Sequence, residues 1–161
     1  MTTFFRTTGL AAVLALTAFA AQAQITLKLA HPVPEADLQQ NLAVEFKRVL
    51  EEKTGGEITV QIFPNGQLGN DQQMIDGTRS GIIDVALIGL NNYTGLVPEA
   101  GAFELPFIFP TREVAYKVLD GAPGQAVATQ METHGLKLLG YGENGYRNMT
   151  NNRGPIKVPA D

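Results

Sequence analysis

The sequence contains no cysteine and only one serine, Ser80. Without cysteine the chain can form no disulfide and can supply no thiolate for catalysis or metal binding, so its fold depends on packing alone. Ser80 is not part of a Gly-x-Ser-x-Gly motif, and the two histidines, His31 and His134, do not have the spacing of a zinc site. These absences argue against a hydrolase and against a metal-dependent enzyme.

A phosphate-binding loop of the Gly-x-x-x-x-Gly-Lys type is absent as well. Carboxylates are frequent, but their positions in the sequence do not pair them for acid–base catalysis. An exported enzyme therefore stays open only as a less favoured alternative. The carboxylates considered are Glu35, Glu99, Glu104 and Glu143.

Acidic residues outnumber basic ones. The chain has 12 Lys and Arg against 16 Asp and Glu, which gives a net charge of −4. A negatively charged protein without a basic cluster is a poor match for nucleic acid or for an anionic membrane surface. An anionic ligand would have to be attracted by local groups, because the overall field repels it.

The first 23 residues have the pattern of an export signal. Arg6 and the N-terminal amine supply positive charge, residues 9–20 form an apolar run, and Ala21-Gln22-Ala23 is a small-x-small cleavage site. The run is shorter than the roughly 20 residues that cross a bilayer. We therefore expect a signal peptide at 1–23, cleavage after Ala23, and a product in the bacterial periplasm with no membrane anchor of its own.

Strand and helix patterns alternate between residues 25 and 90. Residues 25–30 and 58–63 alternate between apolar and polar positions, which predicts two strands, and the apolar run at 82–90 predicts a third strand buried on both faces. Helical spacing of apolar residues predicts a helix from Leu38 to Leu50. A shorter helix should follow, capped by Asn70 or Asp71, and the favoured role of Asp71 is in this local turn and cap. This order predicts an α/β fold with a mainly parallel sheet flanked by helices.

The pattern changes after residue 90. Residues 91–111 contain three prolines and three phenylalanines, which predicts a packed, irregular connection with at most a short helix. Thr111 should begin a helix that Gly121 and Pro123 break, and residues 125–133 should resume it. A further strand is predicted at 136–141. At the end, Pro159-Ala160-Asp161 resembles the first turn of another helix, so we expect the chain to be truncated.

Arg147 is the candidate anion-binding residue. It follows the predicted strand 136–141 and stands among amides and hydroxyls from Glu143 to Asn151. A guanidinium is always charged, and its rigid fork of donors matches a carboxylate. The alternative is a solvated surface arginine.

Ligands in open α/β sheets bind beyond the carboxyl ends of the strands. His31 follows the first predicted strand and is expected to donate to a ligand oxygen, unless it is a surface or capping histidine. Asn91, Asn92 and Tyr93 supply amides and a phenol for hydroxyl or carboxylate oxygens, with a plain turn as the alternative. Asn144 lies in the loop that carries the candidate arginine.

Several blocks resemble, in order and spacing, the periplasmic solute-binding proteins of tripartite ATP-independent periplasmic (TRAP) transporters, the DctP family. The resemblance extends over residues 24–161. The blocks are Leu29-Ala30-His31, Glu52 to Ile58, Phe63 to Gly69, Met74 to Gly77 with Gly81 to Asp84, Pro98-Glu99 with Phe103 to Phe107, and Glu143 to Arg147 with Thr150-Asn151.

The resemblance implies a periplasmic-binding-protein-like fold in which two α/β lobes close on a small organic acid. It implies that residues 24–161 form the first lobe and that the second lobe is largely missing. It also implies that Arg147 occupies one of the family's ligand-contacting arginine positions, and that the principal carboxylate arginine follows in a strand after Asp161. It implies no cofactor and no chemistry, and delivery of the ligand to the membrane subunits of a transporter driven by an ion gradient. Dicarboxylates, keto acids and sugar acids all remain possible ligands.

A second alternative concerns the partner. A two-lobed binding protein can also serve an ABC transporter or a sensor kinase, and the fold does not decide between them.

Overall fold

The computed structural model describes residues 24–146 and 150–158. The predicted signal peptide at 1–23 therefore lies outside the described residues, as does the predicted helix start at 159–161. The strands are β1 (Ile25–Ala30), β2 (Ile58–Phe63) and β3 (Val85–Ala86). The helices are α2 (Leu38–Lys53), α3 (Asp71–Arg79), α4 (Arg112–Leu119) and α5 (Ala122–Thr133), with two 3-10 helices, η1 (Leu90–Tyr93) and η2 (Pro98–Glu104).

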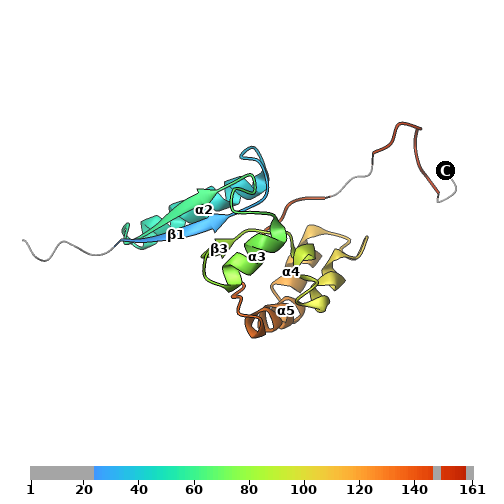
Figure 1. Ribbon diagram of the computed structural model, residues 1–161. Coiled ribbons are helices and arrows are strands. Elements are labelled where there is room, and N and C mark those ends of the chain that lie inside the picture. Colours follow the sequence, from blue (N-terminus) through green and yellow to red (C-terminus); the bar gives the residue numbers. More distant parts are fainter. Residues whose placement is uncertain (1–23, 147–149, 159–161) are drawn as a thin grey trace, which may run out of the picture.

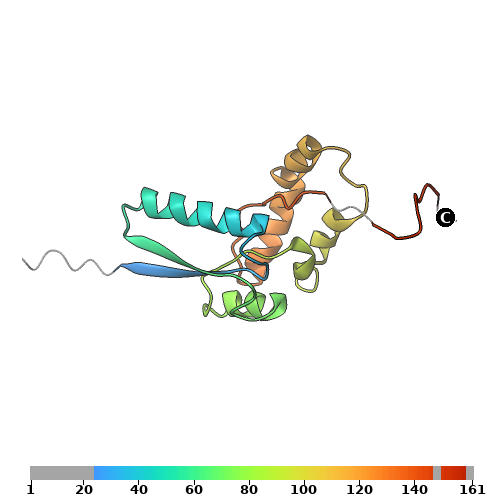
Figure 2. The same cartoon turned by 90° about the horizontal axis from the view of Figure 1, so that it is seen from above.

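The three strands form one parallel sheet in the order β2-β1-β3. The helix α2 connects β1 to β2 along one face of the sheet, and α3 lies on the opposite face (Figure 1, Figure 2). The predicted parallel sheet flanked by helices is therefore confirmed. The predicted bounds of the first two strands, 25–30 and 58–63, agree with β1 and β2.

Local sequence signals define both ends of α2. Asp37 precedes the helix, and its side chain accepts a hydrogen bond from the Gln39 amide at 3.0 Å, which satisfies one of the free N–H groups of the first turn. Gly55 and Gly56 follow the helix with φ angles of 57° and 82°. Such positive φ angles are accessible to glycine at little cost, so the chain can turn into β2 there.

The helix α3 begins with a capping box. The side chain of Asn70 accepts from the amide of Gln73 at 2.9 Å, and the side chain of Gln73 accepts from the amide of Asn70 at 2.9 Å. Met74 and Ile75 on the inner face of the helix are fully buried. Caps and buried face together fix this helix against the sheet, as the sequence predicted.

The predicted strand at 82–90 is mostly wrong. Only Val85 and Ala86 pair with β1, opposite Leu29 and Ala30. After Ala86 the reason is the register, because β1 ends at Ala30, whose carbonyl accepts a last hydrogen bond from the Leu87 amide at 2.9 Å. Ile82 is 67% exposed, so the run is not buried on both faces either.

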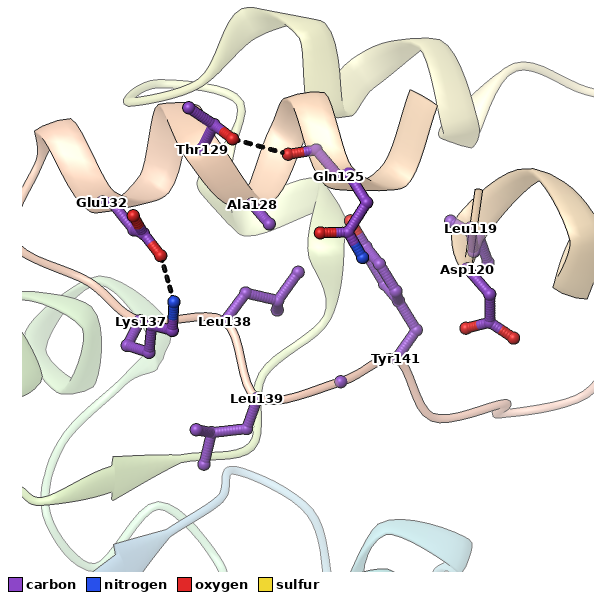
Figure 3. Close-up of a pocket in the computed structure, with 11 residues that line it drawn as sticks. Leu119, Asp120, Gln125, Ala128, Thr129, Glu132, Lys137, Leu138, Leu139 and Tyr141 are labelled. Atoms are coloured by element: carbon purple, nitrogen blue, oxygen red, sulfur yellow. Dashed lines mark hydrogen bonds and ion pairs between the residues drawn. The ribbon is translucent and has the colours of Figure 1, made fainter. Parts of the chain in front are cut away.

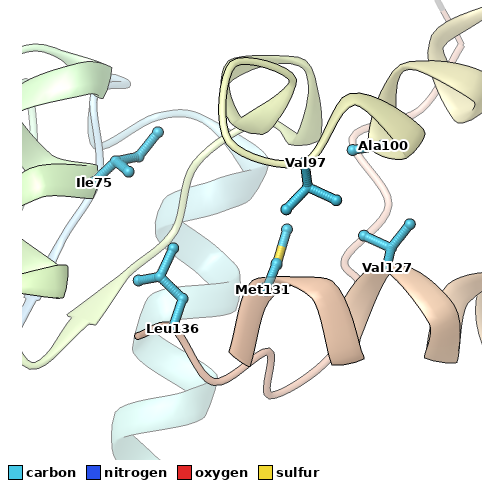
Figure 4. Close-up of a cluster of buried hydrophobic side chains, with 6 residues drawn as sticks. All are labelled: Ile75, Val97, Ala100, Val127, Met131 and Leu136. Atoms are coloured by element: carbon cyan, nitrogen blue, oxygen red, sulfur yellow. The ribbon is translucent and has the colours of Figure 1, made fainter. Parts of the chain in front are cut away.

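Beyond β3 the chain forms a second helical group around its own core. Figure 4 shows Met131 and Val127 of α5 pointing towards Val97 and Ala100. Ile75 of α3 and Leu136 complete the buried cluster, so this group is continuous with the helix beneath the sheet. Each fully buried large apolar side chain contributes about 1.5–3 kcal/mol.

Two expectations for this region need correction. α5 begins at Ala122, so Pro123 lies inside its first turn, where the missing N–H of proline costs no hydrogen bond. Residues 136–141 form no strand, because within the described ranges they pair with none of the three strands. Leu136 is buried against α5, whereas Leu139 is 69% exposed.

Candidate functional site

The parallel strands end at one edge of the sheet, and the predicted ligand residues follow them there. β1 has β2 on one side and β3 on the other, so the strand order reverses at β1. Open α/β sheets bind ligands beyond the strand ends at such a point. His31 directly follows β1, α3 begins after β2, and η1 follows β3. These three elements form the candidate binding edge.

His31 is completely buried. Its main chain extends the ladder between β1 and β2, because its amide donates to the Phe63 carbonyl and its carbonyl accepts from the Gly66 amide, both at 3.1 Å. Nε2 of its ring lies 2.7 Å from Oε1 of Gln40 on α2. An amide oxygen can only accept, so Nε2 carries the proton and donates. The alternative of a surface histidine is wrong.

The other ring nitrogen of His31, Nδ1, is buried and has no hydrogen-bond partner among the described residues. With the proton on Nε2, Nδ1 is an acceptor. An unsatisfied buried polar atom costs about 1–3 kcal/mol. A ligand hydroxyl or a water that donates to Nδ1 would recover this cost, whereas the sequence suggested the opposite role of donor.

Asn91, Asn92 and Tyr93 all lie in η1. The side chain of Asn91 is exposed and folds back over Gly89, whose added Cβ would meet Asn91 Oδ1 at 2.6 Å. Asn92 and Tyr93 are half-buried. The three residues therefore lie in a single 3-10 turn that follows β3.

Tyr93 packs against the cluster around Ile75, and burial raises the pKa of its phenol to about 12, with a smaller contribution from the negative charge of Asp71. The hydroxyl is therefore protonated throughout the neutral range and is available as a donor. Asp71, the first residue of α3, has a buried Oδ1 without a hydrogen-bond partner in the described part of the chain.

Sequence reasoning assigned Asp71 to a local turn or cap, but the structure gives the cap to Asn70. Asp71 is thus a polar residue at the candidate edge for which the sequence had favoured a turn or cap role. The signal was weak because Asn and Asp are both good N-caps, and adjacent residues cannot be ranked by type alone.

Asn144 is exposed on an irregular segment after Tyr141. Within the described part of the chain no hydrogen bond joins it to His31 or η1, so the structure does not bring it together with the other candidates. Arg147 lies outside the described residues. His31, Asp71 and Tyr93 are the candidates associated with the strand ends.

A hollow of about 240 Å³ lies elsewhere, between α5 and residues 137–141 (Figure 3). Its polar contacts include the ion pair of Glu132 with Lys137 and a hydrogen bond from Tyr141 Oη to the Gly124 carbonyl at 2.9 Å. None of the predicted ligand residues lines it. It is therefore separate from the candidate binding edge.

Residues Gly140 to Gly145 have the spacing Gly-x-Gly-x-x-Gly. In dinucleotide-binding proteins this spacing matters where a strand passes into a helix, whose N-terminus then binds the pyrophosphate. Here residues 136–146 contain neither a strand nor a helix. The structural context for a dinucleotide site is therefore missing at this motif.

Residues 24–146 and 150–158 contain no group of three or more His, Asp or Glu side chains arranged to hold a metal ion. Within the same ranges, none of the helices combines the length and the apolar character needed to cross a bilayer.

Comparison with known proteins agrees with the fold. The model of the bacterial extracellular solute-binding proteins, family 7 (DctP), matches residues 29–161. The chain belongs to this family, so the predicted resemblance is confirmed. The family consists of solute-binding proteins and not of enzymes, which removes the alternative of an exported enzyme.

The 2,3-diketo-L-gulonate-binding periplasmic protein YiaO of Escherichia coli K12 is 41% identical over 136 residues, which are 84% of this chain and 42% of that protein. A TRAP periplasmic solute-binding protein from Ochrobactrum anthropi, solved with its C-terminus bound in the ligand-binding pocket, is 34% identical. It superimposes with a TM-score of 0.79 over 84% of this chain and 42% of its own.

The sugar acid binding protein DctPAm from Advenella mimigardefordensis, solved in complex with galactonate, is 32% identical. Its TM-score is 0.76 over 80% of this chain and 42% of its own. The chain thus spans about two-fifths of the length of these relatives. Its partial binding-protein fold is that of a family of periplasmic receptors.

Proposed function

We propose that the complete protein is an extracytoplasmic receptor that binds a small organic acid and delivers it to a TRAP-type transporter driven by an ion gradient. The family match over residues 29–161 carries this proposal. Two relatives add to it, because one is named for binding 2,3-diketo-L-gulonate and another was solved with galactonate. Sugar acids are therefore the first ligands to test, followed by dicarboxylates.

The proposal includes the organisation of the chain. Residues 1–23 are a signal peptide cleaved after Ala23, and residues 24–161 are the first α/β lobe of a two-lobed protein. The three-stranded sheet with helices on both faces supports the assignment to a lobe. The relatives, more than twice as long, support the existence of a second one.

Arg147 is the proposed carboxylate-binding residue. A carboxylate that leaves water for a protein cleft needs a charged, hydrogen-bonded partner, because burial of an isolated ion is strongly unfavourable. A bidentate guanidinium supplies both charge and direction. Lysine would replace it poorly, since a compact ammonium cannot present two parallel N–H groups to one carboxylate.

The remaining contacts are proposed for the oxygens that distinguish one acid from another. Amides at Asn91, Asn92 and Asn144 can donate and accept, which suits hydroxyl groups. The protonated phenol of Tyr93 can donate, and the unsatisfied Nδ1 of His31 can accept. A ligand with several hydroxyls beside its carboxylate uses this set more fully than a simple dicarboxylate does.

The neighbouring genes distinguish delivery to a TRAP transporter from the two alternatives, an ABC transporter and a sensor kinase. Two adjacent genes for integral membrane subunits, one small and one large, agree with the proposal. An adjacent ATPase or histidine-kinase gene in place of that pair favours the alternative.

A thermal-shift screen of the complete protein tests ligand binding. Each acid is paired with its neutral counterpart, for example galactonate with galactose, and succinate is included as a dicarboxylate. A ligand at about 100 times its Kd stabilises the folded protein by roughly 2.7 kcal/mol, which raises the unfolding temperature by several degrees. Shifts for the acids alone support the proposal, and equal shifts for galactose and galactonate contradict it.

A further inference from the structure

The strand β2 lies at the edge of the sheet in the part of the chain that the structure describes, because the strand order is β2-β1-β3. Its six residues, Ile-Thr-Val-Gln-Ile-Phe, carry no charge and include neither proline nor glycine. Short uncharged segments of high β-propensity pair readily with identical segments of other chains when their edge is open. A second copy of this chain is therefore the partner that this edge would attract.

The backbone groups of β2 alternate between β1 and the outer edge. At the start of the ladder, the Ile25 amide donates to the Glu57 carbonyl at 2.9 Å. Because a parallel ladder uses every second residue of each strand, the odd-numbered residues of β2 turn their N–H and C=O groups towards β1. Ile58, Val60 and Ile62 therefore point theirs away from the sheet.

Side chains of α2 and of its C-terminal capping residue, Thr54, occupy the first two of these outward-facing positions. Glu51 Oε1 accepts from the Val60 amide at 2.9 Å, and Lys47 Nζ donates to the Val60 carbonyl at 2.8 Å. The Thr54 hydroxyl lies 3.3 Å from both the amide nitrogen and the carbonyl oxygen of Ile58. Lys47, Glu51 and Thr54 are four and three residues apart, so they form one stripe at the end of the helix.

The two side chains over Val60 also hold each other in place. Lys47 Nζ lies 3.5 Å from Glu51 Oε1 in an ion pair, and Val60 is only 2% exposed. Hydrogen bonds that involve a charged group are stronger than those between neutral groups. A strand that approaches Val60 would have to break both bonds and would leave two charged groups without their backbone partners.

We propose that α2 closes the outer edge of β2 to a second copy of this chain, and that Lys47 and Glu51 are the residues that close it. Two identical edges can meet antiparallel about a twofold axis, so the strand that is kept out is the β2 strand of the other copy. The Lys47–Glu51 pair occupies the N–H and the C=O that such pairing needs at Val60. This role concerns the assembly of the chain and is independent of the ligand that the protein binds.

Ile62 provides a reference on the same edge. Within the described ranges no side chain binds its outward N–H and C=O groups, and Pro64 beyond it has no N–H. In the wild-type protein the Val60 amide should therefore exchange its hydrogen more slowly than the Ile62 amide. Equal exchange at the two positions would show that Glu51 does not protect the edge.

Sedimentation velocity of the complete protein, measured over a range of concentrations, tests the closed edge. Lys47→Ala with Glu51→Ala should self-associate at a concentration about tenfold or more below that of wild type. Arg48→Ala with Glu52→Ala is the matched control, because it removes an ion pair of the same spacing from the same helix, 2.7 Å long, that does not contact β2. The control should sediment like wild type.

Glu51→Gln separates the hydrogen bond from the charge. A glutamine side chain keeps an oxygen that can accept from the Val60 amide, but it has no charge to pair with Lys47 or to repel another copy. This variant should stay as dispersed as wild type. If it associates as strongly as Glu51→Ala, charge repulsion keeps the copies apart and the role given to the hydrogen bonds on Val60 is wrong.

Hydrogen exchange of the Lys47→Ala/Glu51→Ala variant locates the contact between copies. Exchange at Val60 and Ile62 should slow as the protein concentration rises, while α5 is unchanged. A variant that stays folded and monomeric, or that associates without a change at these two amides, overturns the proposal. If the double variant unfolds, shown by loss of its circular dichroism, Glu51→Ala is measured in its place with Glu52→Ala as the control, and the same outcomes decide.

Discussion

Nε2 of His31 lies 2.7 Å from Oε1 of Gln40, and this hydrogen bond joins the end of β1 to the first turn of α2 inside the molecule. It is a polar contact between the candidate binding edge and α2. The ring is fully buried, so water cannot replace Gln40 without a local rearrangement. The bond therefore fixes both the orientation of the imidazole and the position of its proton.

Gln40→Ala should destabilise the protein by about 1–3 kcal/mol, because it leaves the Nε2–H of His31 buried without an acceptor. Asn41→Ala is the matched control, since Asn41 is the next residue of α2 and its side chain is exposed. Urea unfolding of the complete protein measures both. Equal midpoints for the two variants would contradict the structural role given to Gln40.

Tyr93 predicts a specific alkaline dependence of stability. Its pKa rises from a usual value of 10.0 to about 12 in the folded protein. Below pH 10 both states keep the proton. Between pH 10 and pH 12 only the folded state keeps it, so the unfolded state gains stability as protons are released and the free energy of unfolding falls with rising pH.

Tyr93→Phe should remove this fall, because phenylalanine has no phenol to titrate. A rise of the pKa from 10.0 to about 12 corresponds to about 2–3 kcal/mol in the free energy of unfolding. The measurement is the free energy of unfolding of wild type and variant at pH 9, 10, 11 and 12. Tyr146→Phe, at an exposed ring, should follow the wild-type curve. If the free energy of unfolding falls with pH in parallel for wild type and Tyr93→Phe, folding does not raise the pKa of this phenol.

Gly124 permits the close approach of α4 and α5. A Cβ added at Gly124 would lie 1.7 Å from the carbonyl oxygen of Leu119, so the two helices would have to separate. Gly124→Ala should therefore destabilise the protein by about 2–3 kcal/mol or more. Gly95→Ala is the control, because a Cβ there meets nothing within 4 Å. Similar stability of the two variants in urea would refute this reading of the helix contact.

The export signal gives a separate prediction. Protein recovered from the periplasm of a bacterial host should begin at Gln24, which intact-mass measurement determines to the residue. A variant with bulky residues at the cleavage site, Ala21→Leu with Ala23→Leu, should accumulate uncleaved. Recovery of the wild-type chain with Met1 still attached would contradict the predicted cleavage after Ala23.

The parts of the fold that sequence predicted best are those with local causes. Strands at Ile25–Ala30 and Ile58–Phe63 alternate in polarity, and α2 and α3 carry their own caps in Asp37 and Asn70. Each of these signals acts over a few residues. The predicted order of strands and helices in this part of the chain agrees with the observed parallel sheet, so the α/β class was predictable from local signals.

The errors have non-local causes. The apolar runs at 82–90 and 136–141 look like strands, but pairing depends on a neighbour. β1 ends opposite Ala86, and residues 136–141 pair with no strand in the described ranges. A strand pattern indicates that a segment can pair, but it does not indicate that a partner strand lies beside it.

The candidate site was predictable in outline only. The rule that ligands bind beyond parallel strand ends led to His31 and Tyr93, and both lie at that edge. The burial of His31 and its bond to Gln40 were not predictable, because they join residues from two elements. The same holds for the contact between Arg112 and Glu143, which are 31 positions apart in the sequence.

Titration calorimetry of the complete protein with its best organic acid, in wild type, Arg147→Ala and Arg147→Lys, tests the central claim most directly. A bidentate arginine that neutralises a buried carboxylate should be worth about 3–5 kcal/mol, so Arg147→Ala should lose roughly two to four powers of ten in affinity. Arg147→Lys should recover only part of this loss. An Arg147→Ala variant that binds the acid within about threefold of wild type, well under 1 kcal/mol, would contradict the account.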